Sequence, residues 1–409
     1  MNENLNKSAL FNGSCFALIT TAFSFSIRAG ILPQLGDQFG LSAEQLGFIN
    51  MMWFIGFPIS MVIGGLVYHT IGPRIIMYVA FVSHTLGILL TIFAGGYSTL
   101  LISTLFIGIG NGCTEAACNP MIADMYSGLT MNKMLNRFHM WFPGGIVLGA
   151  LISKFMTDFG FGWEAQMWII MVPTVIYAVL FFGKKFPDPQ VEGATSLKEN
   201  LKAMISPVYI FLIVCMALTA ITEFGPNQWV AIVLGSSGAD AMLILALTFG
   251  VAAVGRFFAG PVVASLGQTG VLLGGSILAA IGIYMFSTVT GSIAYLAAII
   301  FGIGYCYFWP VMVGAVAQRV PLSSALGMSI IGAVGMFSTA IFQPFIGSWI
   351  DSARAENMAQ GLTGDALELA TGQDTLEKMI AFPVILIVLF TIFFFWQRNP
   401  KRTKEMAVH

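Results

Sequence analysis

Long apolar runs dominate the sequence, and polar residues interrupt them only at intervals. The runs from Phe11–Leu32 to Met379–Trp396 repeatedly reach the roughly 20 residues that an α-helix needs to cross a hydrocarbon core of about 30 Å. Because the runs are continuous, they favour membrane-spanning helices over the short alternating strands of a β-barrel. The pattern therefore predicts an all-α membrane protein with about twelve transmembrane helices.

The predicted spans follow one another closely along the chain. They lie near residues 11–35, 45–68, 75–95, 99–122, 138–157, 164–183, 205–234, 240–261, 270–289, 293–317, 325–350 and 378–397. Two connections are longer than the others, the central segment Lys184–Met204 and the acidic segment Asp351–Lys378, and we expect both to be loops. We expect His69 and His84 to be structural residues at the membrane interface.

Composition supports a membrane protein and narrows the classes of function. Charged residues make up 9% of the 409 residues, against about 25% in soluble domains. The net charge of -1 gives no general attraction to nucleic acid. The sequence has neither a P-loop for ATP nor Cys and His residues at metal-ligand spacing. We therefore predict a monomer that is not an enzyme, that has no cofactor, and whose partners are lipid, a small-molecule solute and protons.

Lysine and arginine residues gather on one side of the predicted membrane. If the N-terminus is inside, the outer loops hold Lys154, Arg354 and Lys378. The inner side then holds Lys7, Arg74, Lys133, Arg137, Lys184, Lys185, Lys198, Lys202, Arg319, Arg398, Lys401, Arg402 and Lys404. Because basic loops stay in the cytoplasm, the bias predicts a multi-pass protein of the plasma membrane (bacterial inner membrane) with both termini cytoplasmic.

The chain repeats itself at about half its length. Gly65 and Gly72 at the end of the second span correspond to Gly260 and Gly267 at the end of the eighth. The fourth and tenth spans both carry a Gly-Ile-Gly sequence followed by a proline. The offset of roughly 190–195 residues is typical of two six-helix halves related by duplication.

The repeat and the charged central segment together predict the domain organisation. We expect a six-helix half over residues 1–183 and a cytoplasmic linker over 184–204. The second six-helix half then covers 205–397, and a cytoplasmic tail covers 398–409.

The loop after the second span carries a family resemblance. It has Gly65, Gly72 and Arg74 in the spacing Gly-x-x-x-Asp-Arg-x-Gly-x-Arg of the major facilitator superfamily, with His69 and Thr70 in place of the Asp and first Arg. The fold thus resembles that superfamily, which implies transport by alternating access.

Two further strings resemble the fucose permease group of sugar–proton symporters. One is Gly112-Cys-Thr-Glu-Ala-Ala-Cys-Asn-Pro120, which contains Glu115, and the other is Gly255-Arg256-Phe257. The resemblance implies that Glu115 is a proton-linked carboxylate. The second carboxylate of that group is missing from the first span, where this chain has Arg28.

Four ionisable residues lie well inside predicted spans: Arg28, Glu115, Glu223 and Arg256. Such residues are expensive in lipid and normally face a partner or a wet cavity. Their depths, from a rise of about 1.5 Å per residue, match Arg28 with Glu223 in the outer half and Glu115 with Arg256 in the inner half. We predict that the first pair closes the outer side and the second the inner side, with Glu115 as proton acceptor. The alternative is that each charge is satisfied within its own half or snorkels outward.

The seventh span carries the richest set of polar candidates for solute binding. Pro226 interrupts its helix, and Asn227 and Gln228 offer amides that suit a hydroxylated solute. Trp229 can stack on a sugar ring. The alternative is a kinked gate whose amides face the outer water.

Other polar and aromatic residues inside the spans are also candidates for solute binding, with packing, capping or interfacial anchoring as the alternative. They are Asn50, Asn111, Asn119, His139, Trp141, Tyr305, Trp309 and Gln343.

The sequence thus predicts proton-coupled transport of a small polar solute, most simply a sugar, by alternating access. An antiporter that expels amphipathic drugs or metabolites is the alternative, and a wide aromatic cavity would favour it. A receptor on the same fold that does not transport is a third possibility.

Overall fold

The computed structural model describes residues 5–189 and 197–397, which are almost entirely α-helical. No strand occurs in these two ranges, and the short η1 (Pro321–Ser323) is a 3₁₀ helix. The α-helices are α1 (Lys7–Phe39), α2 (Ala43–Ile92), α3 (Tyr97–Met125), α4 (Gly128–His139), α5 (Trp141–Asp158), α6 (Trp163–Phe181), α7 (Leu197–Met204), α8 (Pro207–Gln228), α9 (Val230–Val233), α10 (Ala241–Phe257), α11 (Ala259–Thr288), α12 (Ile293–Tyr305), α13 (Phe308–Arg319), α14 (Ser324–Ala359), α15 (Gly364–Met379) and α16 (Ala381–Gln397).

The described chain crosses the membrane region twelve times, as predicted. Ten helical stretches are long and apolar enough to span a membrane. The second of them, α2, has 50 residues and turns back at Gly72, whose φ of 74° is a conformation that favours glycine. It therefore supplies two crossings, and the shorter apolar α10 supplies the last. The prediction of an all-α membrane fold is confirmed.

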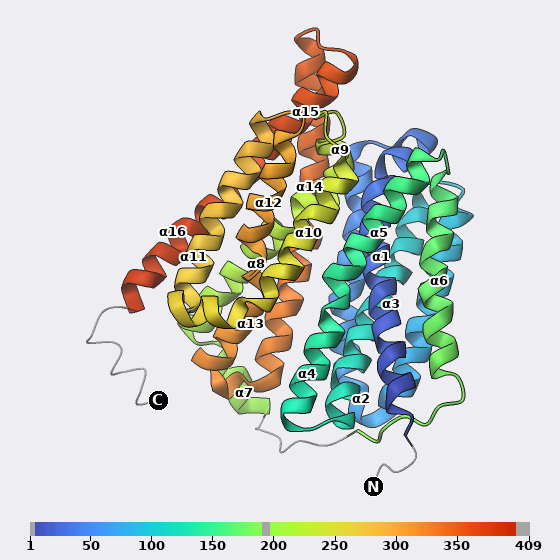
Figure 1. Ribbon diagram of the computed structural model, residues 1–409, viewed down its shortest axis with the longest axis vertical. Helices are drawn as coiled ribbons and strands as arrows, with labels where there is room; N and C mark the ends of the chain where they lie inside the picture. The colour runs from blue at the N-terminus through green and yellow to red at the C-terminus, as the bar shows by residue number, and fades with distance from the viewer. Residues whose placement is uncertain (1–4, 190–196, 398–409) are drawn as a thin grey trace.

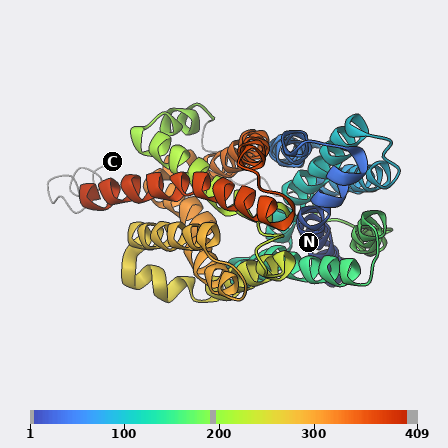
Figure 2. The same cartoon turned by 90° about the horizontal axis from the view of Figure 1, so that it is seen from above.

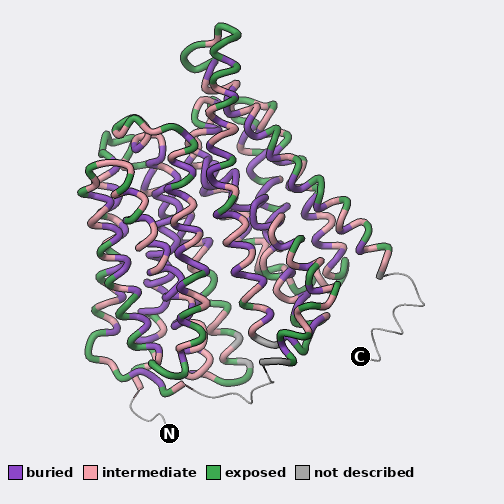
Figure 3. Tube along the Cα trace, turned by 180° about the vertical axis from the view of Figure 1, so that it is seen from behind, coloured by how far each residue is buried: buried purple, intermediate pink, exposed green. Residues whose placement is uncertain are grey.

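The helices form two groups that lie side by side (Figures 1 and 2). We name α1–α6 the N-terminal bundle and α8–α16 the C-terminal bundle. We name the end of the molecule where α1 begins the N face and the end where α1 stops at Phe39 the far face. Buried residues concentrate along the middle of the molecule, and exposed ones on its outside (Figure 3).

Backbones of the two bundles touch near the far face. A Cβ atom added to Gly47 of α2 would lie 2.5 Å from the carbonyl oxygen of Gln343 in α14. One added to Gly347 of α14 would lie 2.7 Å from the Cα of Glu44. Such approach requires residues without side chains, as in other membrane helix pairs.

Charged and polar contacts join the same ends. Asp351 of α14 accepts hydrogen bonds from the backbone N–H groups of Ala43 and Glu44, both at 2.9 Å, where α2 begins. Lys154 at the end of α5 lies 2.8 Å from a carboxylate oxygen of Asp240 at the start of α10. The bundles are thus held together at the far face.

The prediction of a loop over Asp351–Lys378 is wrong. Helix α14 continues to Ala359, and α15 follows after a short turn, so that a helical hairpin projects beyond the far face (Figure 1). Arg354 is bound by both carboxylate oxygens of Glu368 at 3.1 and 2.7 Å, and Asn357 donates to Asp374 at 2.7 Å. A polar segment is expected to be exposed, but it need not be a loop. Here the polar side chains of α14 and α15 pair with one another and stabilise the two helices.

The other long connection is described only in part. Its C-terminal end forms α7, whereas residues 190–196 of the predicted linker and the predicted tail, 398–409, lie outside the described residues.

We predict that Gly347→Val disrupts the contact between α2 and α14. Overpacking of this kind costs about 1–3 kcal/mol, so the purified protein should melt several degrees lower. Gly274→Val in α11, where no atom lies within 4 Å of an added Cβ, is the matched control because it carries the same helix-propensity cost. Equal melting temperatures for the two variants would contradict the close contact.

Candidate functional site

A ring of buried polar and aromatic side chains joins the two bundles below the far face. Its members come from α1, α2, α8 and α14 and from the residue that ends α8. We name it the Arg28 cluster, and it consists of Arg28, Asn50, Trp53, Gln228, Trp229 and Gln343.

Specific contacts hold the cluster together. Arg28 donates from Nη2 to the Oε1 of Gln228 at 3.1 Å, across the two bundles. Its guanidinium carbon lies 5.0 Å from the ring centroid of Trp53, within cation–π distance. On the other side, Trp229 donates from Nε1 to the Oε1 of Gln343 at 2.8 Å.

Asn50 completes the cluster from α2. It lies one helical turn before Trp53 and is fully buried, and neither of its amide atoms has a hydrogen-bond partner among the described residues. The next turn of the same helix carries Gly47, whose backbone meets Gln343. The structure therefore pairs the sequence candidates Trp229 and Gln343, joins Gln228 to Arg28, and places Asn50 one turn from the contact of Gly47 with Gln343.

A second polar group, built around Glu223, lies within the C-terminal bundle. Glu223 of α8 is 2% exposed, and its Oε1 lies 3.7 Å from the Nη2 of Arg256 in α10. The Nε of Arg256 donates to the carbonyl of Cys306 at 3.2 Å, which fixes the guanidinium between α8 and α12. The second oxygen of Glu223, Oε2, has no partner among the described residues. The pair is an ion contact longer than a hydrogen bond.

The predicted pair of Arg28 and Glu223 is wrong for this structure, in which the far face is closed. Glu223 faces Arg256 of its own bundle, and Arg28 faces Gln228. Depth along a helix axis, from which the pair was predicted, leaves open the direction in which a side chain points around that axis.

Glu115 also has a partner other than the predicted Arg256. It is half-buried on α3, and Asn119, one turn further, donates from Nδ2 to its Oε2 at 2.5 Å and to its carbonyl at 3.1 Å. Asn119 is thus engaged by Glu115 within the helix.

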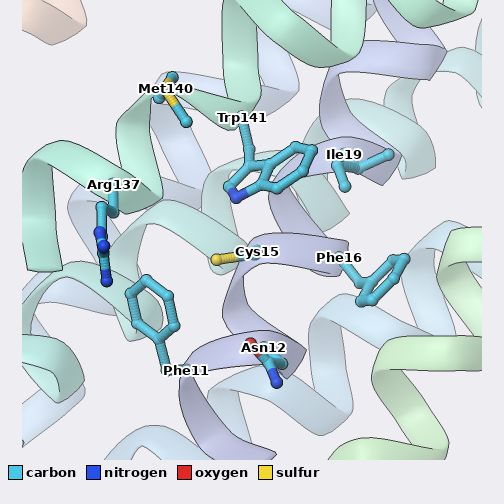
Figure 4. A pocket seen from close by; sticks show the side chains of 8 residues that line it. All are labelled: Phe11, Asn12, Cys15, Phe16, Ile19, Arg137, Met140 and Trp141. Atoms are coloured by element: carbon cyan, nitrogen blue, oxygen red, sulfur yellow. The ribbon is translucent and has the colours of Figure 1, made fainter. Parts of the chain in front are cut away.

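A cavity of about 270 Å³ lies toward the N face, between α1 and the α4–α5 junction. Its lining is mainly apolar and aromatic, and Figure 4 shows these side chains surrounding one space. The lining residues are Phe11, Asn12, Cys15, Phe16, Ile19, Arg137, Met140 and Trp141. Trp141 lines this cavity, whereas His139 is exposed and lies outside the lining.

The remaining candidates are used in packing between helices. Asn227 donates to the carbonyl of Glu223 at 2.7 Å and accepts from Thr248 at 3.2 Å. Tyr305 is fully buried against Phe301, at 5.0 Å between ring centroids. The alternative that Asn227 and its neighbouring amide face the outer water is wrong, because both side chains are buried.

Trp309 differs from these candidates in being half-buried. Its ring meets that of Phe224 edge to face, with 6.3 Å between the centroids.

The sequence analysis missed a polar chain in the N-terminal bundle. His84, predicted at the interface, is fully buried, with Nε2 2.9 Å from the Oδ1 of Asn111 and Nδ1 3.0 Å from the hydroxyl of Tyr177. Ser24 accepts from Asn111 at 3.2 Å and from the indole of Trp53 at 2.9 Å. This series of hydrogen bonds therefore ends at the indole of Trp53, whose ring contacts Arg28. The position of His84 in the middle of an apolar span was the available signal.

Comparison of the sequence with known proteins gives a match to one family model and to several curated relatives. The family is described as Major Facilitator Superfamily and matches residues 14–343. The hexuronate transporter of Bacillus subtilis (strain 168) is 28% identical over 169 residues, 41% of this chain and 40% of the relative. The arabinose-proton symporter of Escherichia coli (strain K12) is 22% identical over 180 residues, 44% of this chain and 37% of the relative. The alignments thus span about two fifths of these relatives.

Comparison of the fold extends over nearly the whole chain. A bacterial homolog of the human lysosomal transporter Spinster, in an inward-facing and unoccupied conformation, has a TM-score of 0.75 at 18% identity, with 96% of this chain and 97% of that chain covered. The nucleoside transporter NupG has a TM-score of 0.73 at 14% identity, with 96% and 99% covered. These likenesses concern the fold alone. The family match over residues 14–343 shows that the chain belongs to the Major Facilitator Superfamily, and these likenesses agree with its multi-pass membrane fold.

Proposed function

We propose that the chain carries a small, polar, hydroxylated solute across the plasma membrane by proton-coupled alternating access. The observation that carries the proposal is the buried carboxylate of Glu223, held 3.7 Å from Arg256 in the interior of a transporter. A carboxylate in such a place is a natural proton carrier, because its charge is costly to keep away from water.

The distribution of basic residues supports an orientation with the N face in the cytoplasm. In that orientation the contacts at the far face close the outer side, and the cavity at Trp141 lies toward the cytoplasm. We propose that the predicted halves, residues 1–183 and 205–397, are the bodies that rock against each other. The linker 184–204 and the tail 398–409 then lie in the cytoplasm.

The far face has contacts suited to repeated opening. The carboxylate of Asp351 sits at the N-terminus of α2, where backbone N–H groups and the helix dipole favour an anion. The ion pair of Lys154 and Asp240 is only partly shielded from water and therefore adds modest stability. Such contacts hold one conformation by a few kcal/mol at most, which solute binding can overcome.

Protonation of Glu223 supplies the coupling step in this proposal. The titratable groups near it are Arg256 of α10, Tyr305 of α12 and Cys306, which follows α12. Adding a proton removes the attraction between the carboxylate and Arg256. The guanidinium is then held through its bond to the carbonyl of Cys306, and one of the contacts between α8 and α10 is lost. Glu115 remains a second candidate for a proton site.

The names of the curated relatives fit a polar organic solute. They include a hexuronate transporter, an arabinose-proton symporter and a niacin/nicotinamide transporter. A second candidate function is efflux of amphipathic compounds by proton antiport, which the aromatic lining of the cavity favours through Phe11, Phe16 and Trp141.

We expect Glu223→Gln to abolish accumulation driven by a proton gradient, because the amide can neither take up nor release a proton. Exchange of labelled for unlabelled solute without a gradient should persist in liposomes containing the variant. Glu115→Gln, made in the same preparation, separates the two carboxylates. If Glu223→Gln accumulates solute as the unchanged protein does, Glu223 is not the coupling site.

We expect Asp351→Ala to open the far face more often. Loss of a charge-assisted hydrogen bond of about 1.5–3 kcal/mol shifts a two-state equilibrium by roughly tenfold or more. A cysteine at Asn50→Cys, a fully buried position, should then react faster with a membrane-impermeant thiol reagent added at the far face. The control is Asp365→Ala on the exposed part of α15. Equal labelling rates in the two backgrounds would argue against a closing role for Asp351.

A further inference from the structure

We propose that Arg28 binds a carboxylate of the transported solute, so that the substrate is an organic acid rather than a neutral sugar. This inference rests on the proposed transport function and specifies the chemical class of its substrate. It starts from the hydrogen-bonding capacity that the buried cluster leaves unused.

Arg28 is a buried cation that contacts no carboxylate among the described residues. It is 5% exposed, and its polar contact is the Nη2 bond to the neutral amide of Gln228. Its Nε and Nη1 atoms have no hydrogen-bond partner among the described residues. Glu223, the acid that the sequence suggested for it, is occupied with Arg256. Buried arginines are normally paired, because an uncompensated charge away from water is strongly unfavourable.

The neighbouring amides add donors rather than acceptors. The Oε1 of Gln228 accepts from Arg28, and the Oε1 of Gln343 accepts from the indole of Trp229. Arg and Trp side chains can only donate, so these bonds determine which way each amide is turned. The Nε2 atoms of both glutamines are buried without partners among the described residues. Arg28, Gln228 and Gln343 therefore all carry buried N–H groups that have no acceptor among the described residues.

A ligand that satisfies this set must be rich in acceptors and negatively charged. A carboxylate accepts several hydrogen bonds, and the planar guanidinium binds it through paired N–H···O bonds. Trp53 covers one face of the guanidinium, which leaves its N–H edge to a ligand. Asn50 offers both a free donor and a free acceptor, which suits a hydroxyl group beside the carboxylate.

The position of the cluster fits a transported ligand. Arg28 and Asn50 belong to the N-terminal bundle, and Gln228 and Gln343 to the C-terminal bundle. A carboxylate among them contacts both moving bodies at once. Binding of the carboxylate therefore favours the relative position of the two bundles in which both sets of contacts are made.

The first experiment needs no knowledge of the solute and compares melting temperatures of purified variants. Arg28→Met replaces an under-satisfied cation by an apolar side chain of similar length, so the variant should melt at or above the temperature of the unchanged protein. Arg256→Met is the matched control and should melt lower, because it leaves the buried Glu223 carboxylate without its cation. A fall for Arg28→Met as large as that for Arg256→Met would make Arg28 a structural residue and overturn the proposal.

The second experiment identifies the ligand class with matched probes. D-glucuronate and D-gluconate should raise the melting temperature of the unchanged protein, and D-glucose, which lacks the carboxylate, should not. Arg28→Met should lose this response, and Arg28→Lys, which keeps the charge without the planar fork, should bind at least roughly tenfold more weakly.

The other outcomes separate this inference from the proposed function. Stabilisation by D-glucose alone overturns the carboxylate assignment but leaves sugar transport standing. Stabilisation by inorganic phosphate alone, or by none of the anions, also overturns it. Proton coupling is decided independently by Glu223→Gln in liposomes, so either proposal can fail without the other.

Discussion

The constraint on which this structure depends is the cost of an ionised side chain inside a membrane protein. Lipid offers no hydrogen bonds, so every such group must find its partner within the bundle or in a water-filled passage. Glu223 meets Arg256 and Glu115 meets Asn119, each within its own bundle. Among the described residues, the hydrogen-bond partner of Arg28 is the neutral Gln228, across the bundles. This difference makes Arg28 the residue whose environment is least explained by folding alone.

Close contacts join the two bundles at the far face. Backbones touch there at Gly47 and Gly347, and Asp351 binds the start of α2. The cavity beside Trp141 lies toward the N face and is lined by residues of the N-terminal bundle. A transporter that exposes its interior to one side at a time needs closing contacts that are weak enough to exchange.

Helix α8 connects the two polar groups of the site. It carries Glu223 in its C-terminal third and Gln228 as its last residue, so the carboxylate and the partner of Arg28 lie little more than one turn apart. Phe25 of α1 packs against both regions, with its ring centroid 5.8 Å from those of Trp53 and Phe224. Both polar groups therefore include side chains of α8, which ends at Trp229. A movement of α8 at one group is transmitted over a short distance to the other.

The sequence by itself determined the number of membrane crossings, the helical fold and the residues whose charge or polarity is out of place in lipid. These features follow from the composition and from the lengths of the apolar runs, which are properties of the linear sequence. It misassigned the end of α14 and α15 as a loop, because cross-helix pairs such as Arg354 with Glu368 are invisible in a linear pattern. Only the tertiary structure decided that Glu223 faces Arg256, that His84 is buried beside Asn111, and that Arg28 meets Gln228 and Trp53. The reason is geometric: spacing along a helix indicates depth, but the rotation of each helix and its neighbours decide which side chains meet.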